Sequence, residues 1–159
     1  MKTTFAIRAG SIALVLAASA FGQAKPAEYH SASELKEHFI KLAEEAKTKK
    51  SGSTGADLGA YENHALKLSY RRETGLAEVH VHLADVMFVT GGSATMVTGG
   101  SLVEPKNENV NEIRGKSIDG GTRQVLSAGD VIHIPAGTPH QLLLDQGKDF
   151  QAFVVKIHD

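Results

Sequence analysis

The stretch GDVIHIPAGTPH, residues 129–140, narrows the choice of fold more than any other part of the sequence. Its opening Gly-Asp pair is typical of a turn, and the short apolar run that follows has the length and the β-branched residues of a buried strand. Pro135 and Gly137 then favour a tight bend, and His140 comes directly before another apolar run. The stretch therefore predicts a strand, a bend and a second strand that begins with an imidazole.

A second segment, residues 78–82, alternates polar and apolar residues. In a strand this alternation places Glu78, His80 and His82 on one face and the two valines on the other. A lone His on such a face is more often structural, but two imidazoles at this spacing can bind one metal ion. Glu78 would then be a further ligand, or an acceptor that orients a metal-bound histidine.

These two segments resemble the two sequence motifs of the cupin family. The second motif, Gly-x5-Pro-x-Gly-x2-His-x3-Asn, is matched at four positions, with Leu144 in place of the final Asn: Gly129, Pro135, Gly137 and His140. The first motif, Gly-x5-His-x-His-x3,4-Glu-x6-Gly, is similar to residues 75–92, where both histidines are present. The leading Gly is one residue closer, and the acid is Asp85, which keeps the spacing to Gly92.

The resemblance implies a double-stranded β-helix, which is a small jelly-roll barrel, with a metal ion in its mouth. It carries the family's metal ligands over to His80, His82 and His140, and provisionally to Asp85, whose shorter side chain departs from the motif. Three imidazoles and one carboxylate suit a single divalent ion of Zn, Fe, Mn, Ni or Cu without choosing among them. Such a site keeps positions open for water or a substrate.

The remaining sequence from residue 64 is typical of an all-β domain. Short runs rich in β-branched and aromatic residues alternate with glycine-containing turns. They predict strands at 64–72, 77–82, 85–90, 93–98, 124–127, 131–134, 140–144 and 150–157. Residues 104–123 are polar and rich in Gly and Asn, and they predict a long loop that could lie across an opening of the barrel.

An amphipathic helix is expected before the barrel. Leu35, Phe39, Leu42 and Ala46 recur at helical spacing, and they predict a helix near 32–49, with the serine at position 31 as its N-terminal cap. Its apolar side is expected to pack against the domain or against a second copy of the chain. We therefore expect an N-terminal α-helix and linker at 25–54 and an all-β barrel domain at 55–159.

Residues 1–24 are expected to direct the chain out of the cytoplasm. Two cations are followed by an uncharged apolar run and then by small residues at the spacing that a signal peptidase reads. We predict a secretory signal peptide cleaved after Ala24, and a periplasmic or extracellular protein that does not contact the membrane after cleavage. A permanent membrane anchor is the alternative, although the apolar run is short for one.

The composition excludes several classes of function. The 159 residues contain no cysteine, which excludes a disulfide framework and a thiolate metal site, and they contain eight histidines. The formal net charge of −1 argues against a nucleic-acid partner held by bulk electrostatics. The sequence leaves open whether two copies pair as a homodimer.

Three further side chains are candidates for catalysis. Tyr70 and Arg72 alternate on one predicted strand and could supply a proton donor and an anion clamp, and Glu78 lies beside the predicted ligands. The leading interpretation is an exported, cupin-like metal-binding protein. It would act on a small oxygen-bearing molecule as a dioxygenase, isomerase or lyase. The alternatives are a binding module that holds a small ligand or a metal without turnover, and a barrel that has lost its metal.

Overall fold

A computed structural model describes residues 26–158, which form one helix and twelve strands. The helix, α1, spans Ala32–Thr48. The strands are β1 (Ser53–Ala60), β2 (His64–Arg71), β3 (Ala77–His80), β4 (Leu83–Thr98), β5 (Ser101–Val103), β6 (Lys106–Asn109), β7 (Glu112–Gly115), β8 (Ser117–Asp119), β9 (Thr122–Ser127), β10 (Val131–Ile134), β11 (His140–Leu143) and β12 (Phe150–His158). The predicted signal peptide at 1–24 lies outside the described residues.

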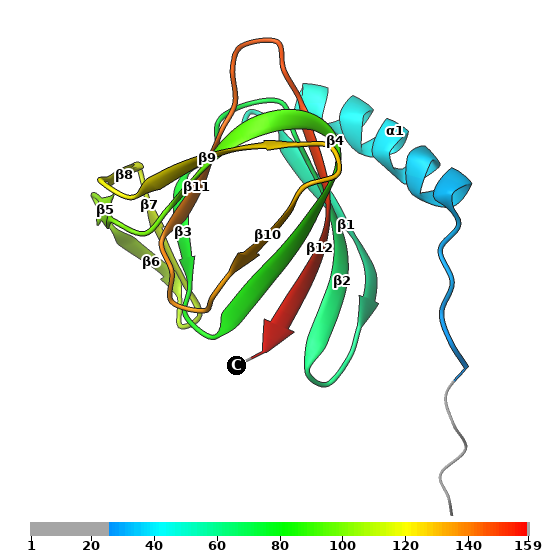
Figure 1. Ribbon diagram of the computed structural model, residues 1–159, viewed down its shortest axis with the longest axis horizontal. Coiled ribbons are helices and arrows are strands. Elements are labelled where there is room, and N and C mark those ends of the chain that lie inside the picture. The colour runs from blue at the N-terminus through cyan, green and yellow to red at the C-terminus, as the bar shows by residue number, and fades with distance from the viewer. Residues whose placement is uncertain (1–25, 159) are drawn as a thin grey trace, which may run out of the picture.

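Ten of these strands form one antiparallel sheet that curls into a barrel (Figure 1). The order along the sheet is β1-β2-β12-β4-β11-β3-β7-β6, and β9 and β10 also pair with β4. β5 and β8 form a separate two-stranded ribbon. This curled sheet with a helix on its outside confirms the expected jelly-roll architecture, and it places β3, which carries His80, beside β11, which carries His140.

The long strand β4 joins the two halves of the barrel. Its first half pairs with β12 and β10, and its second half pairs with β9 and β11. Between the halves, Gly92 has a φ of 72°, and a Cβ at this position would overlap the carbonyl oxygen of Asp149. Only glycine meets both conditions, so this residue allows one strand to turn the corner between two sheets.

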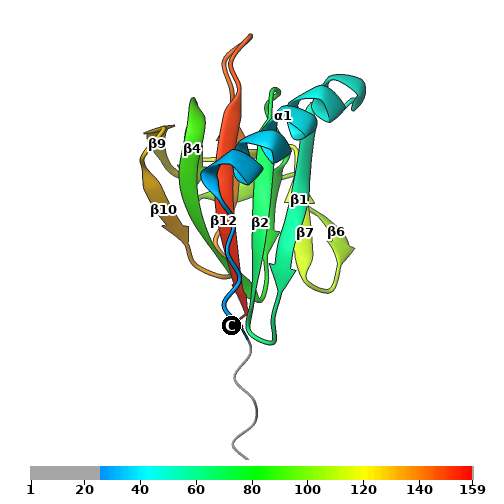
Figure 2. The same cartoon turned by 90° about the vertical axis from the view of Figure 1, so that its right-hand side faces the viewer.

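Helix α1 covers the outer face of β1, β2 and β12, as Figure 2 shows. The hydroxyl of Ser31 accepts a hydrogen bond from the backbone N–H of Glu34 at 3.2 Å, which is the expected N-terminal cap. The predicted apolar positions face the sheet, where Phe39 and Leu42 pack with Leu68 and Tyr70. This packing confirms the helix and accounts for its apolar face.

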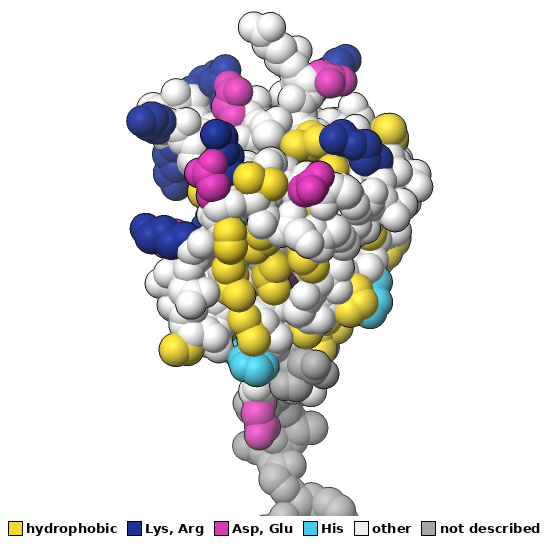
Figure 3. Space-filling model, turned by 90° about the vertical axis from the view of Figure 1, so that its left-hand side faces the viewer, with side chains coloured by type: hydrophobic (Ala, Val, Ile, Leu, Met, Phe, Trp, Pro, Cys, Tyr) yellow, Lys and Arg dark blue, Asp and Glu magenta, His cyan; other side chains and the backbone are white. Residues whose placement is uncertain are grey.

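On the side away from the helix, hydrophobic side chains gather near the middle of the surface and cations lie along one edge (Figure 3). A second apolar cluster fills the interior between the two halves of β4, where Met96, Phe150 and Val154 are buried. Among the described residues, no helix is long and apolar enough to cross a membrane.

The strand predictions hold where hydrophobic alternation is strong and are wrong where it is absent. The runs predicted at 85–90 and 93–98 are one continuous strand, because the two glycines between them pair with β12 and the register shifts by one residue at Thr90 instead of the chain turning. The loop predicted at 104–123 contains β6, β7, β8 and the start of β9. β6 is exposed along its whole length, so it has no buried face to mark in the sequence. β1, at 53–60, is a further strand that the sequence pattern does not predict, and most of it lies within the predicted barrel domain.

Candidate metal centre

A cavity of about 670 Å³ opens inside the curled sheet and receives side chains from both of its halves. Met96, Leu142, Phe150 and Val154 form apolar parts of its lining, and ionisable side chains form the rest. Asn109 and Arg114, from the segment that was expected to be a loop, also line it. Cavities of this size, with an apolar wall and a few converging polar groups, are typical of small-molecule sites.

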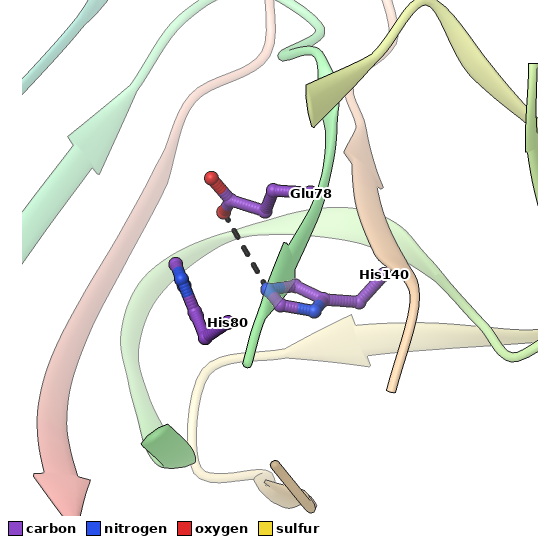
Figure 4. Close-up of side chains that lie close together, drawn as sticks. All are labelled: Glu78, His80 and His140. Atoms are coloured by element: carbon purple, nitrogen blue, oxygen red, sulfur yellow. Dashed lines mark ion pairs between the residues drawn. The ribbon is translucent and has the colours of Figure 1, made fainter. Parts of the chain in front are cut away.

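Glu78, His80 and His140 converge in this cavity (Figure 4). Glu78 and His80 alternate along β3, so their side chains share one face of the strand. His140 is the first residue of β11 and is the direct cross-strand partner of Glu78. Each residue offers one ligand atom, and these three atoms lie within 4.8 Å of one another. The barrel thus places two imidazoles and one carboxylate around one point.

The imidazole of His140 is oriented toward that point. Its Nδ1 lies 3.0 Å from the backbone carbonyl oxygen of Thr138, which can only accept a hydrogen bond. In the neutral ring this contact puts the proton on Nδ1 and leaves the lone pair on Nε2. Nε2 is buried without a hydrogen-bond partner, and it lies 3.5 Å from Oε1 of Glu78. Two acceptors that face each other in a buried site favour a cation between them, either a proton on the imidazole or a metal ion.

The carboxylate of Glu78 stays ionised at this point. Burial raises its pKa, but His140, Arg71 and His80 outweigh that effect and lower the pKa to about 2. Its second oxygen, Oε2, lies 3.2 Å from Nη2 of Arg114. One oxygen is therefore held by a guanidinium group while the other faces the two histidines.

Asp85 is nearby but faces a different cation. It is buried, and Nζ of Lys156 lies 2.8 Å from its Oδ1 and 2.9 Å from its Oδ2. The same nitrogen lies 2.9 Å from Nε2 of His80. Burial raises the pKa of Asp85, but contacts with His80 and Lys156 lower it overall. Glu78, His80 and His140 therefore fit a metal ion, whereas the charge of Asp85 is already balanced by Lys156.

The structure does not bring His82 to the other predicted ligands. β3 ends at His80, the chain bends at residues 81–82, and the side chain of His82 is exposed. The alternation that would place His80 and His82 on one face holds only while the strand continues.

Tyr70 and Arg72 also lie away from the cavity. Tyr70 points from β2 toward α1, and its hydroxyl donates a hydrogen bond to Oδ2 of Asp149 at 3.2 Å. Arg72 follows the end of β2 and is exposed. The residues of β2 next to Tyr70 in the sequence face the opposite way, into the barrel. Arg71, at the end of the strand, therefore lines the cavity.

The sequence left open whether Glu78 is a ligand or an accessory group, although it contains a signal that places Glu78 in the ligand set. When Glu78 is aligned with the first histidine of the cupin motif, His80 takes the second position. Four residues then separate His80 from Asp85, and six separate Asp85 from Gly92, as the motif requires. Lys156 had no such signal, because β12 lies outside both motifs and reaches the site only through strand pairing with β4.

No family model matches the sequence, and no curated protein matches it. Among solved structures, the cupin domain of Cnp3 from Schizosaccharomyces pombe is similar with a TM-score of 0.50 and 10% identity, over 67% of this chain and 65% of that chain. A Cupin 2 conserved barrel domain protein from Salinispora arenicola has a TM-score of 0.46 and 18% identity, over 68% and 77% of the two chains. The polyketide cyclase RemF from Streptomyces resistomycificus has a TM-score of 0.48 and 18% identity, over 69% and 67%.

The topology of the barrel and the likeness to the Cnp3 domain agree on one architecture. Sequence identities this low support a shared fold and nothing more about function. The chain therefore has the cupin fold, with a group of two histidines and one glutamate inside its barrel.

Proposed function

We propose that the protein binds one divalent transition metal ion through Glu78, His80 and His140 and presents it to a small oxygen-bearing molecule. The observation that carries this proposal is Nε2 of His140, which is buried, has no hydrogen-bond partner and faces Oε1 of Glu78 at 3.5 Å. A metal ion would satisfy both atoms at once, because each would donate a lone pair to it.

The donor set suits Zn, Fe, Mn, Ni or Cu, and three protein ligands would leave positions for water or a substrate. When bound, the ion would supply Lewis-acid or redox chemistry. The chain itself would orient the ligands: the carbonyl of Thr138 fixes the His140 ring, and Arg114 holds the second oxygen of Glu78. Lys156 would have to release Nε2 of His80 before that atom could bind the ion.

Within this proposal the leading activity is that of an enzyme of the dioxygenase, isomerase or lyase class. The alternative is a non-catalytic module that holds a small ligand or a metal. The fold does not decide between them, because cupin-fold barrels of one shape can carry different sites. Lys156 favours a third reading, in which its ammonium group replaces the metal. Oxygen consumption or conversion of supplied small molecules by the metal-loaded protein would distinguish the enzyme from the binding module.

Metal analysis tests the proposed site. The protein is loaded with each of the five metals in turn and dialysed, and the ion content per chain is measured by mass spectrometry. We expect close to one ion per wild-type chain for at least one metal, and little in His140→Ala and Glu78→Ala. The matched control is His133→Ala, which removes an exposed imidazole from β10 and should leave the metal content unchanged. An empty wild-type protein after all five loadings contradicts the proposal and leaves the metal-free reading.

We also propose that the protein is exported and acts in the periplasm or outside the cell. The support is the sequence of residues 1–24. N-terminal sequencing of the protein recovered from the periplasm or medium should begin at Lys25, whereas an uncut chain in the membrane fraction would favour an anchor. The homodimer stays a prediction, which sedimentation of the exported protein would test.

A further inference from the structure

We propose that Arg71 forms a binding subsite for the carboxylate group of a small organic acid, in the same cavity as the candidate metal centre. This inference deepens the proposed function and rests on it for the second contact of the ligand. It names the class of molecule that the cavity would take, which the fold alone does not indicate.

Arg71 is directed into the cavity by the alternation of β2. Leu68 and Tyr70 point outward and pack against α1, so Lys67, Ser69 and Arg71 point inward and line the cavity. The guanidinium group of Arg71 lies directly over Gly75, where an added Cβ would overlap its Nη1. The missing side chain at Gly75 leaves room for this cation at the edge of the cavity.

Arg71 is the cation of the cavity that lacks a close acidic partner. The other cations that line it are each paired with a carboxylate. These pairs are Lys67 with Asp57 at 2.7 Å, Arg114 with Glu78 at 3.2 Å, and Lys156 with Asp85 at 2.8 Å. Among the described residues, no ion pair or side-chain hydrogen bond reaches the guanidinium of Arg71. Burial lowers the pKa of Arg71, Glu78 opposes this effect and Arg114 adds to it.

Arg71 is half-buried. A half-buried cation without a hydrogen-bonded anion is only partly compensated, and an incoming anion would stabilise it. The tendency of the cavity to attract an anion would increase when a metal ion is bound. The cavity is lined by four cationic and four acidic side chains, so its formal charge is balanced until a divalent ion is added. The ion would also be bound by Glu78, the acid whose charge now stabilises the protonated form of Arg71. The loaded cavity would therefore attract a negatively charged ligand.

The shape and polarity of the cavity favour an organic acid. A planar guanidinium group matches the two oxygens of a carboxylate and can donate two parallel hydrogen bonds to it. The cavity is also lined by Met96, Leu142 and Phe150. These side chains would contact an apolar part of an organic ligand, whereas an inorganic anion would make no favourable contact with them. A volume of about 670 Å³ leaves room for such a body.

The test measures binding of defined probes by calorimetry and by chemical shifts. The probes are acetate, oxalate, succinate and benzoate, with inorganic phosphate and neutral benzamide as comparisons. They are titrated into metal-free and zinc-treated protein. The variants are Arg71→Gln, Arg71→Lys and the matched control Arg72→Gln, which removes an exposed cation one residue away. Circular dichroism and melting temperature verify that each variant is folded.

We expect at least one carboxylate to bind the wild-type protein more tightly than phosphate or benzamide. Arg71→Gln should weaken that binding roughly 10- to 100-fold, the range for a lost charge-assisted hydrogen-bonded pair. The affinity of Arg71→Lys should lie between those of wild type and Arg71→Gln, because lysine keeps the charge but cannot donate two parallel hydrogen bonds. Arg72→Gln should change the affinity little. Binding that Arg71→Gln leaves intact, or no binding by any carboxylate, overturns the inference.

The two proposals fail separately. If the wild-type protein takes up metal but Arg71→Gln binds carboxylates normally, only the subsite is wrong. If no metal is retained while carboxylates still bind through Arg71, the metal proposal is wrong and the subsite stands.

Discussion

Nζ of Lys156 lies 2.9 Å from Nε2 of His80, the ring atom that would bind a metal ion. The lysine also contacts both oxygens of Asp85. An ammonium group has no lone pair to share, so it cannot bind the ion itself while it is protonated. The barrel therefore holds its own cation on one side of the candidate metal centre, and Lys156 would compete with a metal ion for His80.

Removing this lysine should strengthen metal binding. We expect Lys156→Met to bind zinc about tenfold more tightly than wild type, since it frees Nε2 of His80 and removes a repelling charge. Asp85 would also become available. Isothermal titration of zinc into metal-free protein measures the change, and Lys148→Met, at an exposed site, is the control. Unchanged or weaker zinc binding by Lys156→Met would show that the lysine does not compete.

The Asp85 and Lys156 pair should make stability depend on pH. Because the folded-state pKa of Asp85 is lowered from its ordinary value of 3.8, its contribution is present above that value and is lost as the pH falls below it. At pH 6, Asp85→Asn should cost about 3 kcal/mol of unfolding free energy in the metal-free protein. Chemical denaturation at pH 6 and near pH 3 should show the gap between variant and wild type shrinking in acid. A gap of equal size at both values would contradict this account of the pair.

His82 and His140 should behave differently although both were predicted from motifs. His140 is buried with an orphaned Nε2, while His82 is exposed beyond the end of β3. We expect His82→Ala to bind zinc within about twofold of wild type and His140→Ala to lose roughly 100-fold or more in affinity. Competition with a coloured zinc chelator measures both affinities. A large loss in His82→Ala would mean that β3 extends further than the structure shows.

The corner of β4 should be sensitive to a single methyl group. In Gly92→Ala the new Cβ would overlap the carbonyl oxygen of Asp149 and also strain a positive φ, so we expect a loss of more than about 2 kcal/mol. Gly147 has a similar φ of 76° but open space around it. Gly147→Ala should therefore cost only about 1 kcal/mol. Urea denaturation would compare the two, and equal losses would rule out the steric explanation.

The parts of the fold that were predictable are those where one face of an element is buried. Helix α1 repeats apolar residues at helical spacing, and β3 alternates apolar and polar residues, so their periods appear in the sequence. β6 is exposed on both faces and forms only because β7 offers a partner, so nothing in its own residues predicts a strand. Non-local pairing decides such segments.

The site was predictable only in part for a similar reason. His140 follows from the bend that precedes it, and His80 follows from the alternation in β3. Which residues share the cavity depends on where each strand ends and on its phase. β3 ends before His82, and Arg71 faces inward while Arg72 does not. Lys156 enters from β12, 71 residues after Asp85, and no local pattern connects the two.

Anomalous diffraction from a crystal of the zinc-treated protein tests the central claim most directly, because it locates the ion and its ligands together. We expect one strong peak per chain inside the barrel, at bonding distance from Glu78, His80 and Nε2 of His140, with Lys156 displaced from His80. A barrel without a peak, in which Lys156 still contacts His80, would contradict the account, as would an ion bound by His82 outside this group.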